Sequence, residues 1–463
     1  MRKNSGTLCL LAAFGSLVAA PIQAQKVEQI VKPPKIILWM DASTGGMAGM
    51  PDMEMPGMGG LMGGLMGAMG GMGSKGNADA KNTSKHYYGS ARGLHVSPPR
   101  ILDVALWNGL KPGVEASQRV PAGMNMGESL PLLPVIEANV VEKTGRTIDG
   151  DREVEQPKGR LLFYWGCSTT VRAGQPRILD FTKMTANSAQ AFGSAFSGRF
   201  VPDRGAKVRA GYDVFPNERD QRNLPKGASL IGEHKVVGDS LPDSFRFTLG
   251  AAHDVMPPID LQSTGTLKDS VALNWAPVTN AKAYFMNAMA IQGDDMIFWS
   301  SSEVPDSGFE LFTYLSNANI DKWTKEKVLL DGKTTQCAVP QGIFAPKTGT
   351  TAKSDGEDRQ MDTAFLRMIA YGGEHGFVHP PRPTDPKVPW EQEWFVRLRV
   401  KSQTMAMLGV DMGEESRPAR KSGKATRPNE SAPQEMKAPA EEDSGLKPTL
   451  PDAVNLLKGL FGR

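Results

Sequence analysis

The stretch DSVALNWAPVTNAKAYF, residues 269–285, decides the class of fold in the second half of this chain. Apolar side chains recur there at every second position, at Val271, Leu273 and Trp275, and small or polar residues stand between them. That two-residue period is typical of a strand with one buried face. Pro277 has no amide hydrogen to donate and ends the strand, after which an apolar run resumes. The stretch therefore predicts two strands of a β-sandwich.

A tryptophan that closes one strand and a tyrosine that opens the next, Trp275 and Tyr284, resemble strands B and C of a fibronectin type III-like domain. Two later apolar stretches, 364–371 and 394–400, resemble its strands F and G. The resemblance covers residues 266–402, and the chain departs from it by a long insertion before the third of these strands. Such a fold hosts many unrelated functions, so the resemblance implies a spacer or binding module and no particular chemistry.

The first half of the chain is also patterned as strands. RLLFYWGC, residues 160–167, is nearly continuous apolar sequence, which is typical of a central strand. We therefore expect an all-β protein with two tandem β-sandwich-like (Ig/fibronectin III-like) domains, at residues 86–260 and 261–410. In the closing strand of the second domain, Arg397 and Arg399 alternate with apolar residues and are expected to face solvent.

The first residues, 1–24, have the pattern of a signal peptide. Arg2 and Lys3 form a basic start, an apolar run follows, and cleavage after Ala24 suits signal peptidase. Because removal of the two basic residues lowers the formal charge from +3 to +1, nucleic acid is a poor candidate partner. No other apolar run reaches the roughly 18 residues that a membrane span needs. We expect an exported protein in the periplasm, on the outer surface or in the medium.

Export leaves two cysteines, Cys167 and Cys337. In an oxidising compartment such a pair forms a disulfide or stays as two buried thiols, and both alternatives remain open. The two residues are too far apart in sequence for a Cys-x-x-Cys redox or zinc motif.

The composition changes abruptly after a short strand-like segment at residues 25–44. Residues 45–85 form a low-complexity segment and linker, and the part from Gly45 to Gly73 is almost entirely glycine and methionine. Five of its methionines lie at helical spacing, but each glycine weakens a helix by about 1 kcal/mol relative to alanine. We expect this segment to order only against a partner, a membrane or another copy of the chain.

Three uses of this segment are open. Thioether sulfur is a soft ligand that selects Cu(I), and the segment resembles the Met-rich segments of exported copper-resistance proteins, although it contains no histidine or cysteine. The candidate Cu(I) ligands are Met47, Met50, Met53, Met55, Met58, Met62, Met66, Met69 and Met72. Alternatively, methionine and glycine form an adaptable apolar surface for a partner or for self-association. The third alternative is a flexible insertion.

The tail, residues 411–463, is rich in proline, lysine, glutamate, serine and alanine, so it is expected to be disordered over most of its length. Its last part carries apolar residues at helical spacing, which are Val454, Leu457, Leu460 and Phe461. A short amphipathic helix on a disordered tether is typical of a docking motif for a partner, and a frayed tail is the alternative.

Motifs for catalysis are scarce. The sequence contains no metalloprotease, nucleophile-elbow or Walker motif. Glu374, His375 and His379 are close in sequence but are predicted to lie on a loop, where a hard metal site lacks support. His253 and Asp254 are adjacent, and we interpret that pair as incidental.

We therefore expect an exported, non-catalytic binding or structural protein of the bacterial cell envelope, whose partner is a protein or another envelope component. The alternative is a periplasmic Cu(I)-handling protein that uses the Met-rich segment. A third possibility is an enzyme that acts on envelope or extracellular polysaccharide.

Overall fold

A computed structural model describes six parts of the chain, which are residues 29–49, 87–96, 99–135, 159–183, 199–346 and 364–409. The predicted signal peptide and the predicted tail with its docking motif lie outside the described residues. Within the described parts no helix is both long enough and apolar enough to cross a membrane.

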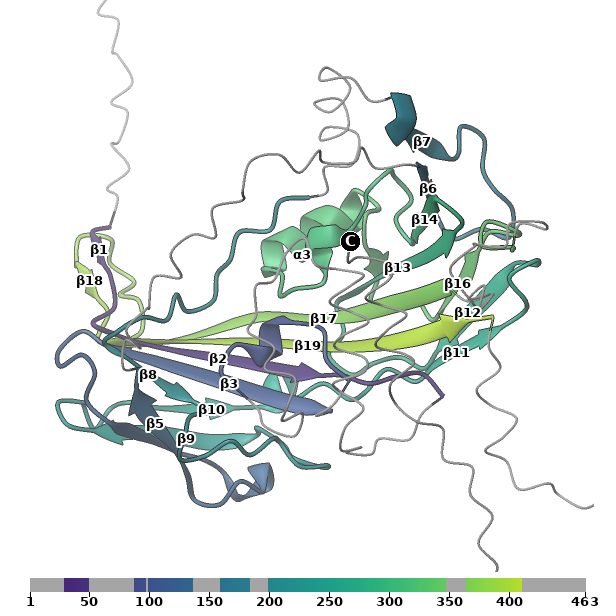
Figure 1. The fold of residues 1–463 in the computed structure, drawn as a ribbon. Helices are drawn as coiled ribbons and strands as arrows, with labels where there is room; N and C mark the ends of the chain where they lie inside the picture. The colour runs from purple at the N-terminus through teal and green to yellow at the C-terminus, as the bar shows by residue number, and fades with distance from the viewer. Residues whose placement is uncertain are drawn as a thin grey trace, which may run out of the picture.

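Most of the described strands belong to one 14-stranded sheet, so the expected all-β class is confirmed (Figure 1). In sheet order its strands are β10 (Arg246–Leu249), β9 (Gly232–Gly238), β4 (Ala116–Arg119), β5 (Ser129–Pro134), β8 (Tyr212–Phe215), β3 (Arg100–Asn108), β2 (Ile36–Thr44), β19 (Trp394–Leu408), β17 (Ala364–His379), β13 (Ala283–Gln292), β14 (Asp295–Ser300), β6 (Arg160–Trp165) and β7 (Arg177–Asp180). A short strand, β15 (Leu330–Asp331), also pairs with β13.

The remaining elements are small. A three-stranded sheet contains β11 (Leu261–Thr264), β12 (Val271–Trp275) and β16 (Gln336–Val339), and a two-stranded ribbon contains β1 (Val31–Lys32) and β18 (Trp390–Glu391). The helices in the described residues are α3 (Asn317–Lys325) and the 3-10 helices η1 (Ser90–Arg92), η2 (Ala122–Met124), η3 (Phe181–Lys183), η4 (Ala251–His253) and η5 (Phe309–Leu311).

The large sheet contains strands from both sides of the expected domain boundary at residues 260 and 261. β6 pairs in parallel with β14, and β2 lies between β3 and β19. The structure therefore differs from a tandem arrangement in which each domain has its own sheets. The difference arises because these pairings join strands that are distant in sequence, which local sequence patterns do not reveal.

The strands expected from the fibronectin type III-like resemblance are present in two sheets. β12 lies in the three-stranded sheet, whereas β13, β17 and β19 are neighbours in the large one. The rings of Trp275 and Tyr284 are in edge-to-face contact at 5.5 Å between the two sheets. Their side chains belong to one continuous apolar core, which we call the main core. The resemblance itself stays a prediction.

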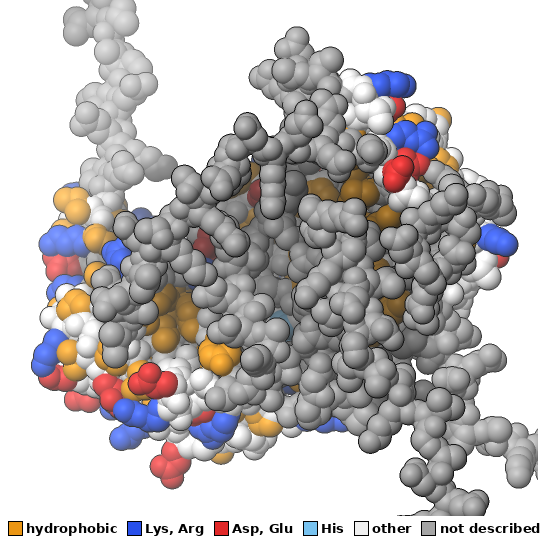
Figure 2. All heavy atoms as spheres, in the orientation of Figure 1, with side chains coloured by type: hydrophobic (Ala, Val, Ile, Leu, Met, Phe, Trp, Pro, Cys, Tyr) orange, Lys and Arg blue, Asp and Glu red, His pale blue; other side chains and the backbone are white. Residues whose placement is uncertain are grey.

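The large sheet folds back on itself, so that β10 packs across β17 and β19. Phe245 stacks on Trp394 with ring centroids 5.2 Å apart, and Phe247 lies 5.8 Å from Phe377. Figure 1 shows β5, β9 and β10 beneath β2 and β3 in that view. On the face drawn in Figure 2, basic and acidic side chains alternate over this region, without a patch of one sign.

The other face of the large sheet, opposite the main core, is called the outer face here. Helix α3 packs on it, with Ile320 and Trp323 against Tyr371 of β17. The helix begins at Ser316, whose hydroxyl accepts a hydrogen bond from the amide of Asn319 at 3.2 Å. A side-chain oxygen at this position satisfies one of the free amides of the first turn.

A disulfide joins Cys167, just after β6, to Cys337 in β16. It links residues 170 positions apart and ties the three-stranded sheet to the end of the large sheet. The structure therefore contains the disulfide form of the two alternatives that the sequence left open.

Candidate functional site

The Met/Gly-rich segment lies in the connection between two fully paired strands. β2 and β3 pair in antiparallel fashion along their whole length, from Ile36 opposite Asn108 to Thr44 opposite Arg100. Residues 45–99, which we call the Met/Gly-rich connection, therefore replace the short turn of a hairpin at the centre of the large sheet. The sequence had instead suggested a linker between an N-terminal segment and a first domain.

The start of this connection extends the sheet. The amide of Ala48 donates to the carbonyl oxygen of Met405 at 2.7 Å, and the amide of Met405 donates to the carbonyl oxygen of Gly46 at 3.1 Å. Met47 forms a parallel bridge with Met405 and is 9% exposed. Of the nine candidate Cu(I) ligands, Met47 alone lies within the described residues, where its side chain is largely packed against protein. The other eight lie outside them.

The end of the connection, residues 87–96, lies on the outer face and is held there by side chains of β19. Nζ of Lys401 donates to the carbonyl oxygens of Arg92 and Gly93, at 3.0 and 3.1 Å. Nε2 of Gln403 also donates to the carbonyl oxygen of Gly93, at 2.8 Å. Both side chains are buried, so these bonds are shielded from water.

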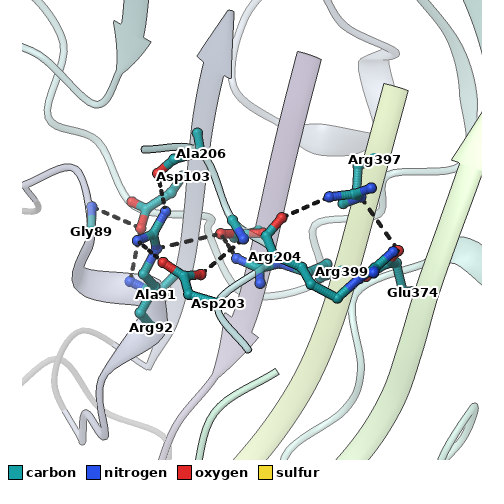
Figure 3. Close-up of polar contacts among 12 residues, drawn as sticks. Gly89, Ala91, Arg92, Asp103, Asp203, Arg204, Ala206, Glu374, Arg397 and Arg399 are labelled. Atoms are coloured by element: carbon teal, nitrogen blue, oxygen red, sulfur yellow. Dashed lines mark hydrogen bonds and ion pairs between the residues drawn. The ribbon is translucent and has the colours of Figure 1, made fainter. Parts of the chain in front are cut away.

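An aspartate of β3 binds the same segment. Oδ2 of Asp103 accepts hydrogen bonds from the amides of Gly89 and Ala91, each at 2.9 Å (Figure 3). These amides belong to the first turn of η1 and have no acceptor within so short a helix. A carboxylate therefore satisfies two backbone donors that a buried turn would otherwise leave unpaired.

The two ends of the connection touch each other. Nε2 of His95 and Oγ of Ser43 are 2.8 Å apart, and the amide of Gly45 donates to the carbonyl oxygen of Pro99 at 2.8 Å. A Cβ atom at Gly45 would lie 2.1 Å from the carbonyl oxygen of His95, so the close approach requires glycine. We call residues 45–48 and 87–96, with the side chains that hold them, the stem.

A row of four charged residues crosses the strands beneath the stem. Asp103, Asp41, Arg399 and Glu374 lie directly opposite one another on β3, β2, β19 and β17. Arg399 donates two hydrogen bonds to the carboxylate of Asp41, at 2.6 and 2.5 Å, and both side chains are buried. The prediction that Arg399 faces solvent is wrong, because its side chain pairs with Asp41 and is covered by the ring of Tyr314.

Glu374 closes the row on the other side. Its carboxylate accepts two hydrogen bonds from Arg204, at 2.9 and 2.8 Å, and lies 3.3 Å from Nε of Arg397 (Figure 3). The predicted loop at residues 374–379 is instead part of β17, so neighbouring side chains leave the strand on opposite faces. His375 accordingly contacts His253 at 4.6 Å, and the described residues contain no group of three candidate metal ligands.

Burial and charge act in different ways on the two cations of β19. Burial and, to a smaller extent, neighbouring Arg399 lower the pKa of Lys401 to about 7, against the opposing effects of Asp41 and Asp103. Burial also opposes the charge of Arg399, but the carboxylate of Asp41 outweighs it and raises the pKa of Arg399. Both cations lie over the ring of Tyr314, at 4.5 and 4.9 Å. An aromatic face is a favourable neighbour for a cation that has left water.

Lys401, Gln403 and Asp103 all bind backbone groups of the stem, so the arrangement serves to fix a segment of chain. Sequence reasoning missed Asp41, Asp103, Lys401 and Gln403. The available signal was a polar residue at every second position of a long apolar strand, which marks one face as polar. Comparison of the chain with models of known families, with curated proteins and with solved structures finds no match.

Proposed function

We propose that this protein is an exported, non-catalytic binding or structural protein of the bacterial envelope, which presents its Met/Gly-rich connection to a partner. The observation that carries the proposal is the stem. Both ends of the connection are held against the centre of a 14-stranded sheet, by Lys401, Asp103 and the Ser43–His95 contact. Binding segments are commonly loops that a rigid scaffold positions, and methionine-rich surfaces adapt to their partners.

Two observations support export. The first residues have the pattern of a signal peptide. The disulfide between Cys167 and Cys337 is the kind of bond that persists in an oxidising compartment and is rare in the cytosol. Fractionation of cells, with alkylation of free thiols before lysis, tests this part. The expected result is a processed, disulfide-bonded protein in an envelope or external fraction, and a reduced cytosolic protein would contradict it.

Two deletion variants test the binding role. In the first, a short Gly/Ser linker replaces residues 50–86 of the Met/Gly-rich connection. In the matched control, the same linker replaces residues 347–363, which lie between β16 and β17. Envelope cross-linking followed by mass spectrometry should give partner cross-links in the native protein and in the control but not in the first variant. The same partners in all three proteins would contradict the proposal, as would a hydrolytic activity that a point mutation abolishes.

Copper(I) binding is the alternative use of the same connection, and the same variants decide it. The test is a competition titration against a chromogenic Cu(I) chelator. Stoichiometric Cu(I) binding by the native protein and the control variant, but not by the variant without residues 50–86, would assign copper handling to the connection. Equal, weak competition by all three proteins would leave partner contact as the function of the connection.

A further inference from the structure

Arg367 occupies a distinct position on the outer face, away from the charged row of the stem. It lies on β17, opposite Asn287 of β13 on one side and Met405 of β19 on the other. Its Nε donates to Oδ1 of Asn287 at 3.0 Å, and its Cζ lies 4.3 Å from the centre of the Phe312 ring. The guanidinium is therefore held both along one edge and across one face.

Among the described residues this cation has no counter-ion. In the described part of the chain no carboxylate pairs with Arg367, whereas Arg399 pairs with Asp41 and Arg204 with Glu374. Burial lowers the pKa of Arg367 to about 10, and no neighbouring carboxylate counteracts that effect. A cation that has lost most of its water without gaining an anion is costly for the folded state.

The two Nη atoms of the guanidinium make no hydrogen bond with the described residues. Arg367 is partly exposed, and its Nη atoms are not among the fully buried donors that lack a partner. The two Nη atoms form a fork whose geometry matches the two oxygens of a carboxylate.

The surroundings of this fork are apolar. Phe365 of β17 and Met289 of β13 are directly opposite each other, two residues along their strands from Arg367 and Asn287. Residues two apart on a strand share a face, so both side chains lie beside the guanidinium. Both are partly exposed, and Phe298 of β14 lies buried beyond Met289.

We propose that Arg367 and Asn287 form a binding site for a carboxylate that carries an apolar chain. The fork of Arg367 binds the carboxylate in a bidentate manner, Asn287 fixes the fork, and the apolar chain contacts Phe365 and Met289. Long-chain fatty acids are the ligand class that combines these two parts. This site is separate from the Met/Gly-rich connection, and its occupancy does not depend on the function proposed for that connection.

Calorimetric titration of the mature protein with sodium laurate, 1-dodecanol and sodium acetate tests the site. We expect laurate to bind at least about tenfold more tightly than either of the others, because only laurate supplies both carboxylate and chain. Equal affinity for laurate and dodecanol would overturn the proposal, as would the absence of laurate binding at about 1 mM. Inorganic phosphate that binds as tightly as laurate would also overturn the choice of ligand.

Substitutions separate binding from a structural role. Arg367→Met should reduce laurate affinity by at least about tenfold and leave dodecanol binding unchanged. Its stability without ligand should equal or exceed that of the native protein, because the unpaired cation is removed. Arg367→Lys keeps the charge but not the fork, and should show an intermediate loss. The control, Arg246→Met on β10, should bind as the native protein does, and a loss below about twofold in Arg367→Met would contradict the assignment.

Discussion

Ser43 and His95 are 52 positions apart in the sequence, yet Oγ of Ser43 and Nε2 of His95 are 2.8 Å apart. This contact closes the base of the Met/Gly-rich connection. The connection is therefore an insertion in a continuous sheet, and its two ends lie side by side.

Shortening the connection should therefore leave the fold intact. Replacement of residues 50–86 by a short Gly/Ser linker should leave stability unchanged or raise it by about 1 kcal/mol, because a shorter loop costs less entropy to close. Far-UV circular dichroism and urea unfolding measure the effect. A variant that unfolds without cooperativity would show that the excised residues belong to the folded body.

Lys401 should make stability depend on pH. Its pKa is about 7 in the folded protein and near 10.5 in the unfolded chain, so between these values the unfolded chain binds more protons. Stability should then rise with pH across this interval, with a slope of up to about 1.4 kcal/mol per pH unit. Urea unfolding between pH 6 and pH 10 should show the slope in the native protein and its absence in Lys401→Met. Parallel curves for the two proteins would refute the assigned pKa.

Asp213 of β8 should act in the opposite direction. Its carboxylate is fully buried, neither oxygen has a hydrogen-bond partner among the described residues, and burial together with Glu115 raises its pKa to about 7. Between pH 3.8 and about 7 the folded protein keeps a proton on Asp213 that the unfolded chain has released. The stability that this proton contributes is therefore lost as pH rises through 7. Asp213→Asn should therefore stabilise the protein at pH 8 by about 1 to 3 kcal/mol. Asp243→Asn, at an exposed site, is the control and should change little.

The pair of Asp41 and Arg399 should be sensitive to loss of one partner. Asp41→Asn leaves a buried guanidinium without its carboxylate and should cost about 3 to 5 kcal/mol. Replacing both residues by apolar ones of similar size should recover much of that loss, since no unpaired charge remains. Urea unfolding of both variants measures the difference. A double variant no more stable than Asp41→Asn would contradict this account.

Local patterns predicted the individual strands better than their assembly. The alternation at Val271, Leu273 and Trp275 predicted β12, and the apolar run of residues 160–167 predicted β6. The charged row beneath the stem was not predictable in this way, because its central ion pair joins Asp41 to a residue 358 positions away. No local period specifies which distant strand becomes a neighbour, and register follows only from the packed sheet.

The position of β2 beside β19 has a consequence for how the chain reaches its native state. These two strands come from opposite ends of the described chain, and they pair in parallel in the middle of the large sheet. Until residues 394–408 have been synthesised, the chain lacks the strand that β2 and β17 both require as a neighbour. Assembly of the middle of the sheet must therefore wait for β19, and contacts of such long range form slowly. A premature stop codon before residue 394 would divide the sheet through its middle.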